Sequence, residues 1–121
     1  MENHNHDIHV DMELYYKRFL DLMEEVKKEN PKYVESFMEF YKATEAPGAL
    51  DTKTKELISI ALAVKAQCEY CIAFHTKNAI LAGATRKEIM ESAFVATLMG
   101  GGPCVAFMRY VVDACDQFGA K

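Results

Sequence analysis

Three features are missing from this chain of 121 residues, and each absence excludes a class of protein. No apolar run approaches the roughly 20 residues of a transmembrane helix, so no membrane partner is expected. The first residues lack the basic and then apolar layout of a signal peptide, which favours a cytoplasmic protein. Basic residues are not in excess, since 14 Lys and Arg stand against 18 Asp and Glu. The net charge of −4 therefore argues against a nucleic-acid partner.

Alternation of period two, the pattern of half-buried strands, is also missing. Apolar residues instead recur every three or four positions from Asp11 onward, which is typical of amphipathic helices. Half of the residues are hydrophobic, and the length suits one domain with a modest core. We therefore predict an all-α fold, a compact bundle of about six helices in a single domain over residues 11–121. Residues 1–10 are predicted to be a mobile tail, in which His4, His6 and His9 give only a weak metal-binding signal.

Capping residues and helix breakers predict where the helices begin and end. Pro31 opens the second helix, Asp51 or Thr52 the third, and Thr85 the fifth, where Glu88 completes a capping box. The third and fourth segments are expected to be nearly continuous, and Gly83 closes the fourth. We expect the fifth helix to reach about Met99, the segment Gly100–Pro103 to form a turn, and a last helix to cover 104–118.

The feature most suggestive of chemistry is the pair Cys68 and Cys71, followed by His75. A close cysteine pair in a cytosolic protein more often means redox chemistry or metal binding than a structural disulfide. On a helix these residues fall at i, i+3 and i+7, which is one face. His75 lies one turn from Cys71, about 6 Å along the axis, but nearly two turns from Cys68. An imidazole there can take the proton of Cys71 and leave the reactive thiolate.

The start of a helix adds to this reactivity, because unpaired amide groups and the helix dipole favour the thiolate over the thiol. One cysteine can then attack an oxidant, and the other can resolve the product as a disulfide. Residues i and i+3 of a helix have Cβ atoms about 5–6 Å apart, whereas a disulfide needs roughly 3.5–4.5 Å. The first turn must therefore adjust when the pair oxidises.

Two other interpretations of the pair stay open. Zinc needs four ligands, and Cys104 or Cys115 could add the fourth to Cys68, Cys71 and His75. Both cysteines of the pair could also be small buried hydrophobes. Haem attachment is disfavoured, because it requires a histidine directly after the second cysteine. Cys104 and Cys115 are about 16 Å apart on one helix, so they cannot bridge each other and are predicted core residues.

Glu56 shares a helix face with Ile60 and Ala63 rather than with other charges. A carboxylate among apolar neighbours is usually paired, and His75 is a natural partner for it. Local sequence alone nevertheless favours an ordinary surface acid, since charged residues are rarely fully buried.

Together these residues resemble the alkylhydroperoxidase D-like (AhpD-like) proteins of the carboxymuconolactone decarboxylase superfamily. The resemblance rests on Glu56, eleven intervening residues, and then the Cys68, Cys71 and His75 spacing. The segments that flank this motif also resemble those of the family, and they are Lys55–Ile58, Ala82–Thr85 and Glu88–Ile89.

The resemblance implies an all-α protein that forms homo-trimers or homo-hexamers and reduces small-molecule hydroperoxides without a cofactor or metal. Cys71 would attack the peroxide, Cys68 would resolve the product, His75 would be the base, and Glu56 would complete the proton relay. A thiol or dihydrolipoamide-type reductant would recycle the disulfide. Tyr70 stands where peroxidase members carry a histidine, and it could only assist by donating a hydrogen bond.

Three function classes follow, and the first is preferred. It is a thiol-dependent peroxidase or disulfide oxidoreductase. The second is lactone decarboxylation of the γ-carboxymuconolactone type, which needs a basic or polar pocket and no cysteine pair. The third is a non-catalytic redox-sensing module. Apolar surface in excess of a small core independently predicts a homo-oligomer.

Overall fold

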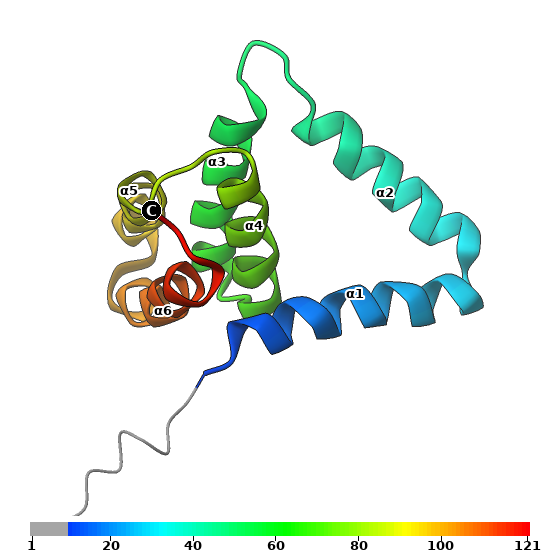
Figure 1. Ribbon diagram of the computed structural model, residues 1–121, viewed down its shortest axis with the longest axis horizontal. Helices are drawn as coiled ribbons and strands as arrows, with labels where there is room; N and C mark the ends of the chain where they lie inside the picture. The colour runs from blue at the N-terminus through cyan, green and yellow to red at the C-terminus, as the bar shows by residue number, and fades with distance from the viewer. Residues whose placement is uncertain (1–9) are drawn as a thin grey trace, which may run out of the picture.

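A computed structural model describes residues 10–121, which form six helices and no strand (Figure 1). The helices are α1 (Met12–Glu29), α2 (Pro31–Glu45), α3 (Thr52–Ala66), α4 (Glu69–Leu81), α5 (Arg86–Val95) and α6 (Thr97–Phe118). The predicted all-α fold of six helices is confirmed. None of the helices within residues 10–121 combines the length and apolar character needed to cross a membrane.

The predicted tail, with its three histidines, lies outside the described residues except for Val10. The carbonyl of Val10 accepts a hydrogen bond of 2.7 Å from Nε2 of Gln117 in α6. Oε1 of the same glutamine accepts a 2.7 Å bond from the backbone amide of Met12. Val10 and the start of α1 are therefore fixed to the C-terminal helix.

Most helix starts follow the local chemistry that predicted them. Asp51 accepts from the amide of Thr54 at 2.8 Å and caps α3. At the start of α5, Thr85 and Glu88 exchange both bonds of a capping box. Pro31 occupies the first turn of α2, where its missing N–H leaves no intrahelical bond unmade.

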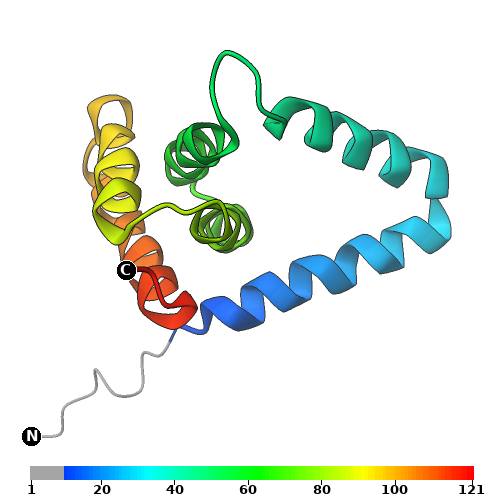
Figure 2. The ribbon, with the colours of Figure 1, turned by 45° about the horizontal axis from the view of Figure 1, so that its top comes forward.

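The prediction that α3 and α4 are nearly continuous is wrong. Gln67 adopts a left-handed conformation, with φ 55° and ψ 52°, and ends α3. The amides of Gln67 and Cys68 bond back to the carbonyls of Val64 and Ala63, which completes the helix end. The chain reverses there, so α3 and α4 lie side by side (Figures 1 and 2).

The predicted break between helices at the triple glycine is confirmed, but the boundaries around it differ. The fifth helix ends at Val95 rather than near Met99. A short helical stretch from Thr97 then precedes the glycines, and α6 consists of this stretch and the last helix, joined by a kink. The kink is at Gly101, whose φ of 61° and ψ of −147° suit only glycine.

The core lies between α3, α4, α5 and α6, with one contribution from the first turn of α1. Its largest fully buried apolar side chains are Met12, Ile60, Ile72, Ile89, Val64 and Val111. Cys104 and Cys115 belong to this core, as predicted, and both are free thiols. The hydroxyl of Ser92 in α5 also donates to the carbonyl of Leu57, which ties α5 to α3.

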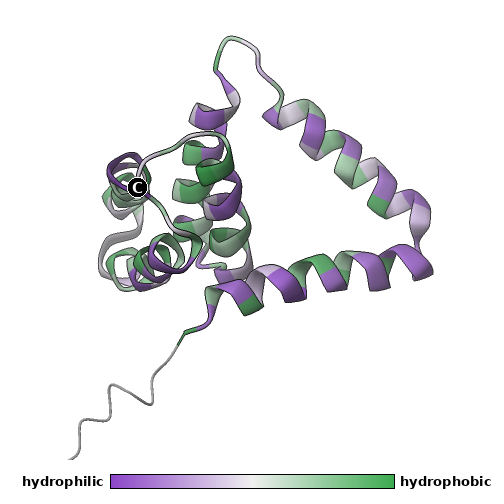
Figure 3. Cartoon of the chain, viewed as in Figure 1, coloured by the Kyte–Doolittle hydropathy of each residue, from purple (hydrophilic) through white to green (hydrophobic). Residues whose placement is uncertain are grey.

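The rest of α1 and most of α2 form an arm that projects from this core (Figures 1 and 2). Val34 is the one side chain of α2 that is buried. Apolar positions occur along both helices of the arm (Figure 3). Tyr33, Phe37 and Phe40 of α2 are each more than half exposed. The arm returns to the core at the end of α2, which brings the last turn of that helix against α3.

Candidate active site

Cys68 and Cys71 form a disulfide at the start of α4. Cys68 is the N-cap residue and is extended, with φ −118° and ψ 103°, so it lies outside the helix proper. Its Sγ accepts a hydrogen bond of 3.2 Å from the amide of Cys71. The Cα atoms are 5.2 Å apart, within the usual disulfide range. Cys68 lies outside the helix, as N-cap residues do, so the Cβ separation of two helical residues does not apply to this pair. The expected adjustment on oxidation stays a prediction.

His75 lies one turn beyond Cys71 on α4, and its side chain is only 20% exposed. Its Nδ1 is 2.7 Å from Oε1 of Glu56 in α3. A carboxylate can only accept a hydrogen bond, so Nδ1 carries the proton. In the neutral imidazole this leaves Nε2 with its lone pair, the arrangement that a general base requires.

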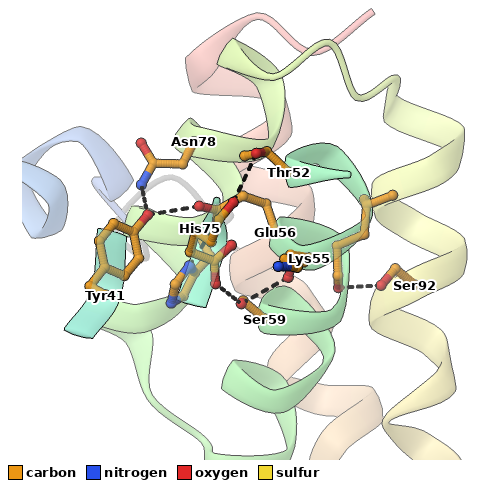
Figure 4. A network of polar contacts seen from close by, with 10 residues as sticks. Tyr41, Thr52, Lys55, Glu56, Ser59, His75, Asn78 and Ser92 are labelled. Carbon is orange, nitrogen blue, oxygen red and sulfur yellow. Dashed lines mark hydrogen bonds and ion pairs between the residues drawn. The ribbon is translucent and has the colours of Figure 1, made fainter. Parts of the chain in front are cut away.

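Glu56 is 2% exposed and lies on the helix face that also carries Ile60 and Ala63. The local prediction of a surface acid is wrong, because the carboxylate is buried and bonded on both oxygens. Besides the bond to His75, Oε2 accepts a 2.7 Å hydrogen bond from Oη of Tyr41 (Figure 4). Such pairing offsets the desolvation of a buried charge.

Tyr41 and Asn78 are the members of this network that sequence patterns missed. Tyr41 reaches Glu56 from α2, and its Oη in turn accepts a 2.9 Å bond from Nδ2 of Asn78 in α4. Burial and the bond to Glu56 both raise the pKa of Tyr41, which keeps the phenol a donor. The sequence marks Tyr41 only as one of an apolar stripe, because nothing local shows what its hydroxyl contacts.

Phe74 separates this network from α1. Its ring centroid lies 5.1 Å from that of Phe19, 5.4 Å from that of Tyr41 and 5.3 Å from that of His75. The ring also stacks on Tyr16 at 6.2 Å. These aromatic contacts fix the arm against α4 and shield the His75 and Glu56 pair on that side.

Tyr70 lies apart from this pair. Its ring makes an edge-to-face contact with Tyr15 of α1, with centroids 5.1 Å apart. Tyr70 precedes Cys71 in the sequence, but its side chain packs against α1. An auxiliary role for Tyr70 remains a prediction.

Metal ligation finds no geometric support within residues 10–121, where no three or more His, Cys, Asp or Glu side chains are grouped to hold an ion. Cys104 is buried in the core, with its Sγ 3.7 Å from the carbonyl of Val64. Cys115 is fully buried, and that burial raises the pKa of its thiol to about 11. Both therefore differ from the half-buried pair at the start of α4.

An open hollow of about 530 Å³ lies where the end of α2 meets α3 and α4. Its lining includes Tyr41, Glu45, Glu56 and Asn78, so it borders the hydrogen-bond network directly. Lys42 is the cation of the lining. Neither cysteine of the pair takes part in the lining, so the hollow opens onto the carboxylate end of the network.

Comparisons with known proteins agree with this geometry. The sequence profile of the carboxymuconolactone decarboxylase family matches residues 31–113. "Uncharacterized protein 4 in cox locus" of Paracoccus denitrificans is 39% identical over 83 residues, which are 69% of this chain and 75% of that protein. A Cupriavidus necator protein, "Uncharacterized protein H16_B0147", is 40% identical over 90 residues, covering 74% of this chain and 80% of its own.

Two solved structures share the fold. The crystal structure of apo-lpg0406, a carboxymuconolactone decarboxylase family protein from Legionella pneumophila, has a TM-score of 0.84 at 36% identity. That match covers 88% of this chain and 96% of the other. TM1620 from Thermotoga maritima, a protein of the same family, has a TM-score of 0.76 at 27% identity and covers 87% and 89%. This chain therefore belongs to the carboxymuconolactone decarboxylase family.

Proposed function

We propose that this protein is a thiol-dependent peroxidase or disulfide oxidoreductase, an enzyme whose active thiols are Cys71 and Cys68. The observation that carries the proposal is the Cys68–Cys71 disulfide at a helix start, one turn before a histidine paired with a buried carboxylate. Thiolate formation needs a base for the proton and a field that favours negative charge. His75 with Glu56 supplies the first, and the start of α4 supplies the second.

In the proposed reaction, Nε2 of His75 takes the proton of the Cys71 thiol. The thiolate attacks one peroxide oxygen, the O–O bond breaks, and the alcohol or water leaves with a proton. Cys71 is then a sulfenic acid, and the thiol of Cys68 displaces water from it to form the disulfide. A dithiol of the dihydrolipoamide type returns two electrons and two protons to the pair. Such a cycle suits the reducing cytoplasm, which we propose as the location.

The comparisons support this chemistry without specifying the substrate. The Thermotoga maritima relative is described as "possibly involved in antioxidative response". Lactone decarboxylation is less well supported, because Glu45 and Glu56 both line the hollow and Lys42 is the one cation among the described residues of that lining. Two carboxylates facing one hollow would repel a dicarboxylic lactone.

Peptide mapping after oxidation tests the proposed thiol pair. The reduced protein is treated with one equivalent of hydroperoxide, free thiols are alkylated after unfolding, and the peptides are identified by mass spectrometry. We expect a Cys68–Cys71 disulfide, with Cys104 and Cys115 alkylated, because both of the latter are buried in the core. Four free thiols after this treatment would contradict the proposal.

A homo-oligomer, trimeric or hexameric, is a second part of the proposal. Apolar side chains are exposed on the arm and at the junction of α5 and α6, where Leu98 is 82% and Met99 85% exposed. Exposed apolar surface of this kind commonly marks a protein interface. Light scattering at micromolar concentration is expected to give at least three times the chain mass of 13.7 kDa. A monomer would contradict this prediction, and Leu98→Glu should lower the mass if the α5–α6 junction is part of the interface.

A further inference from the structure

A second carboxylate, that of Glu45, lines the same hollow as Glu56 and is close enough to Glu56 and His75 for their charges to act on it. Glu45 is the last residue of α2. Its Oε1 accepts a 3.0 Å hydrogen bond from Oγ of Ser59 in α3. Its Oε2 is buried and has no hydrogen-bond partner within the described part of the chain. A buried carboxylate oxygen without a donor is costly, and protonation removes this cost by turning the oxygen into a donor.

Charged groups around Glu45 point the same way. Burial first, and then the negative charge of Glu56, raise the pKa of Glu45 above its ordinary value of 4.5, while the Ser59 bond and His75 act in the opposite direction. Neither of the two nearby lysines bonds the Glu45 carboxylate within the described residues. Lys42 is an exposed residue of the hollow's lining, and Nζ of Lys55 bonds the carbonyl of Ala46 at 2.6 Å. Neighbouring carboxylates that cannot both ionise freely share a proton.

We infer that Glu45 is a positioning residue of the relay, which holds one proton against the carboxylate of Glu56 and releases it to the adjoining hollow. With the proton in place, the two carboxyl groups carry one negative charge beside His75. When the proton leaves to water in the hollow, they carry two. The second charge favours the imidazolium form of His75, because opposite charges nearby stabilise each other. This inference rests on the proposed function for its catalytic meaning.

The consequence for the thiol pair is a pH-dependent base. Below the raised pKa of Glu45, the proton is held and His75 faces one net charge. As the pH rises through that pKa, the second charge appears and His75 becomes a stronger acceptor for the proton of Cys71. The end of α2 therefore couples the arm to the basicity of the relay, a link that Tyr41 reinforces by bonding Glu56 from the same helix.

The ring of His75 can report this directly. We would titrate the disulfide form of the full protein by NMR and assign the His75 signals with His75→Asn. Cys68 and Cys71 do not titrate in that form, and the raised pKa of Tyr41 keeps its phenol protonated. We expect the chemical shifts of His75 to follow two titrations as the pH changes. The larger is that of the imidazole itself, and the smaller, at a pH above the ordinary carboxyl pKa, is that of Glu45.

Glu45→Gln is the decisive variant, because the amide can still accept from Ser59 and has an N–H where the acid would carry its proton, but it has no proton to release. We expect the smaller titration to vanish and the proton affinity of His75 to fall about ten-fold. Glu39→Gln, at an exposed position of the same helix, is the matched control and should leave both unchanged.

The inference would be overturned if Glu45→Gln left the titration of His75 unchanged. It would also be overturned if Glu39→Gln changed that titration as much as Glu45→Gln does. Peroxide turnover plays no part in this readout. A protein without peroxidase activity could still show the coupling, and an active peroxidase could lack it. The failure of the inference is therefore distinguishable from the failure of the proposed function.

Discussion

Replacing Cys71 by serine is expected to lower the rate of hydroperoxide consumption at least about 10³-fold, measured with a dithiol reductant in excess. A serine hydroxyl does not ionise near neutral pH, so the proposed nucleophile is lost even though the two side chains are nearly the same size. The first turn of α4 should remain, because the amide of Cys71 and its bond to Cys68 are not removed. The fold can be checked by circular dichroism.

Cys68→Ser separates the two roles of the pair. Cys71 should still react once with peroxide, and its sulfenic acid should accumulate because no thiol is at hand to displace water. Mass spectrometry with a sulfenic-acid trap would detect it on Cys71. Cys115→Ala is the control for loss of a thiol outside the pair, and its turnover should be unchanged. If sulfenic acid formed on Cys68 in the Cys71→Ser variant instead, the assigned roles would have to be exchanged.

Much of the fold was predictable because its signals are local. An N-cap aspartate, a proline in a first turn or a Thr85–Glu88 capping box acts within four residues, so the start of each such helix can be read from the sequence. The failures came where local signals conflict. Gln67 ends α3 in a left-handed conformation although it is neither glycine nor asparagine. The amides of Gln67 and Cys68 close the helix end in the Schellman pattern, but the residue that usually marks this pattern in a sequence is absent.

The candidate site divides along the same line. Cys71 and His75 lie one turn apart on α4, so their proximity follows from helix geometry, and Cys68 is close to Cys71 because it caps the same helix. Glu56 required knowledge of the family, since its local surroundings favour a surface position. Tyr41 and Glu45 belong to α2, and a loop separates that helix from Glu56 in α3. No spacing rule predicts a contact between side chains on two different helices. The hydroxyl of Tyr41 and the carboxyl of Glu45 contact α3 only because the tertiary fold packs the end of α2 against that helix.

The largest effect without loss of a cysteine is expected for Glu56→Gln, which should lower peroxide turnover roughly 10²- to 10⁴-fold. The amide can keep the bond from Tyr41 on its oxygen, but its nitrogen then donates to Nδ1 of His75 rather than accepting from it. The imidazole must in response carry its proton on Nε2. That nitrogen is the proposed acceptor of the Cys71 proton, so the variant removes the base while leaving every residue of the pair in place.

A control at an exposed position of α5, Glu91→Gln, removes the same charge from the chain and should leave turnover unchanged. Alkylation of reduced Cys71 gives a second readout that needs no peroxide. In Glu56→Gln we expect its rate at neutral pH to fall with turnover, because both depend on the thiolate. Turnover within two-fold of the unmodified protein would show that His75 does not act as the base through Glu56. Slow turnover with unchanged alkylation would instead place the carboxylate in a later step, such as protonation of the departing alcohol, and so separate activation of the thiol from cleavage of the O–O bond.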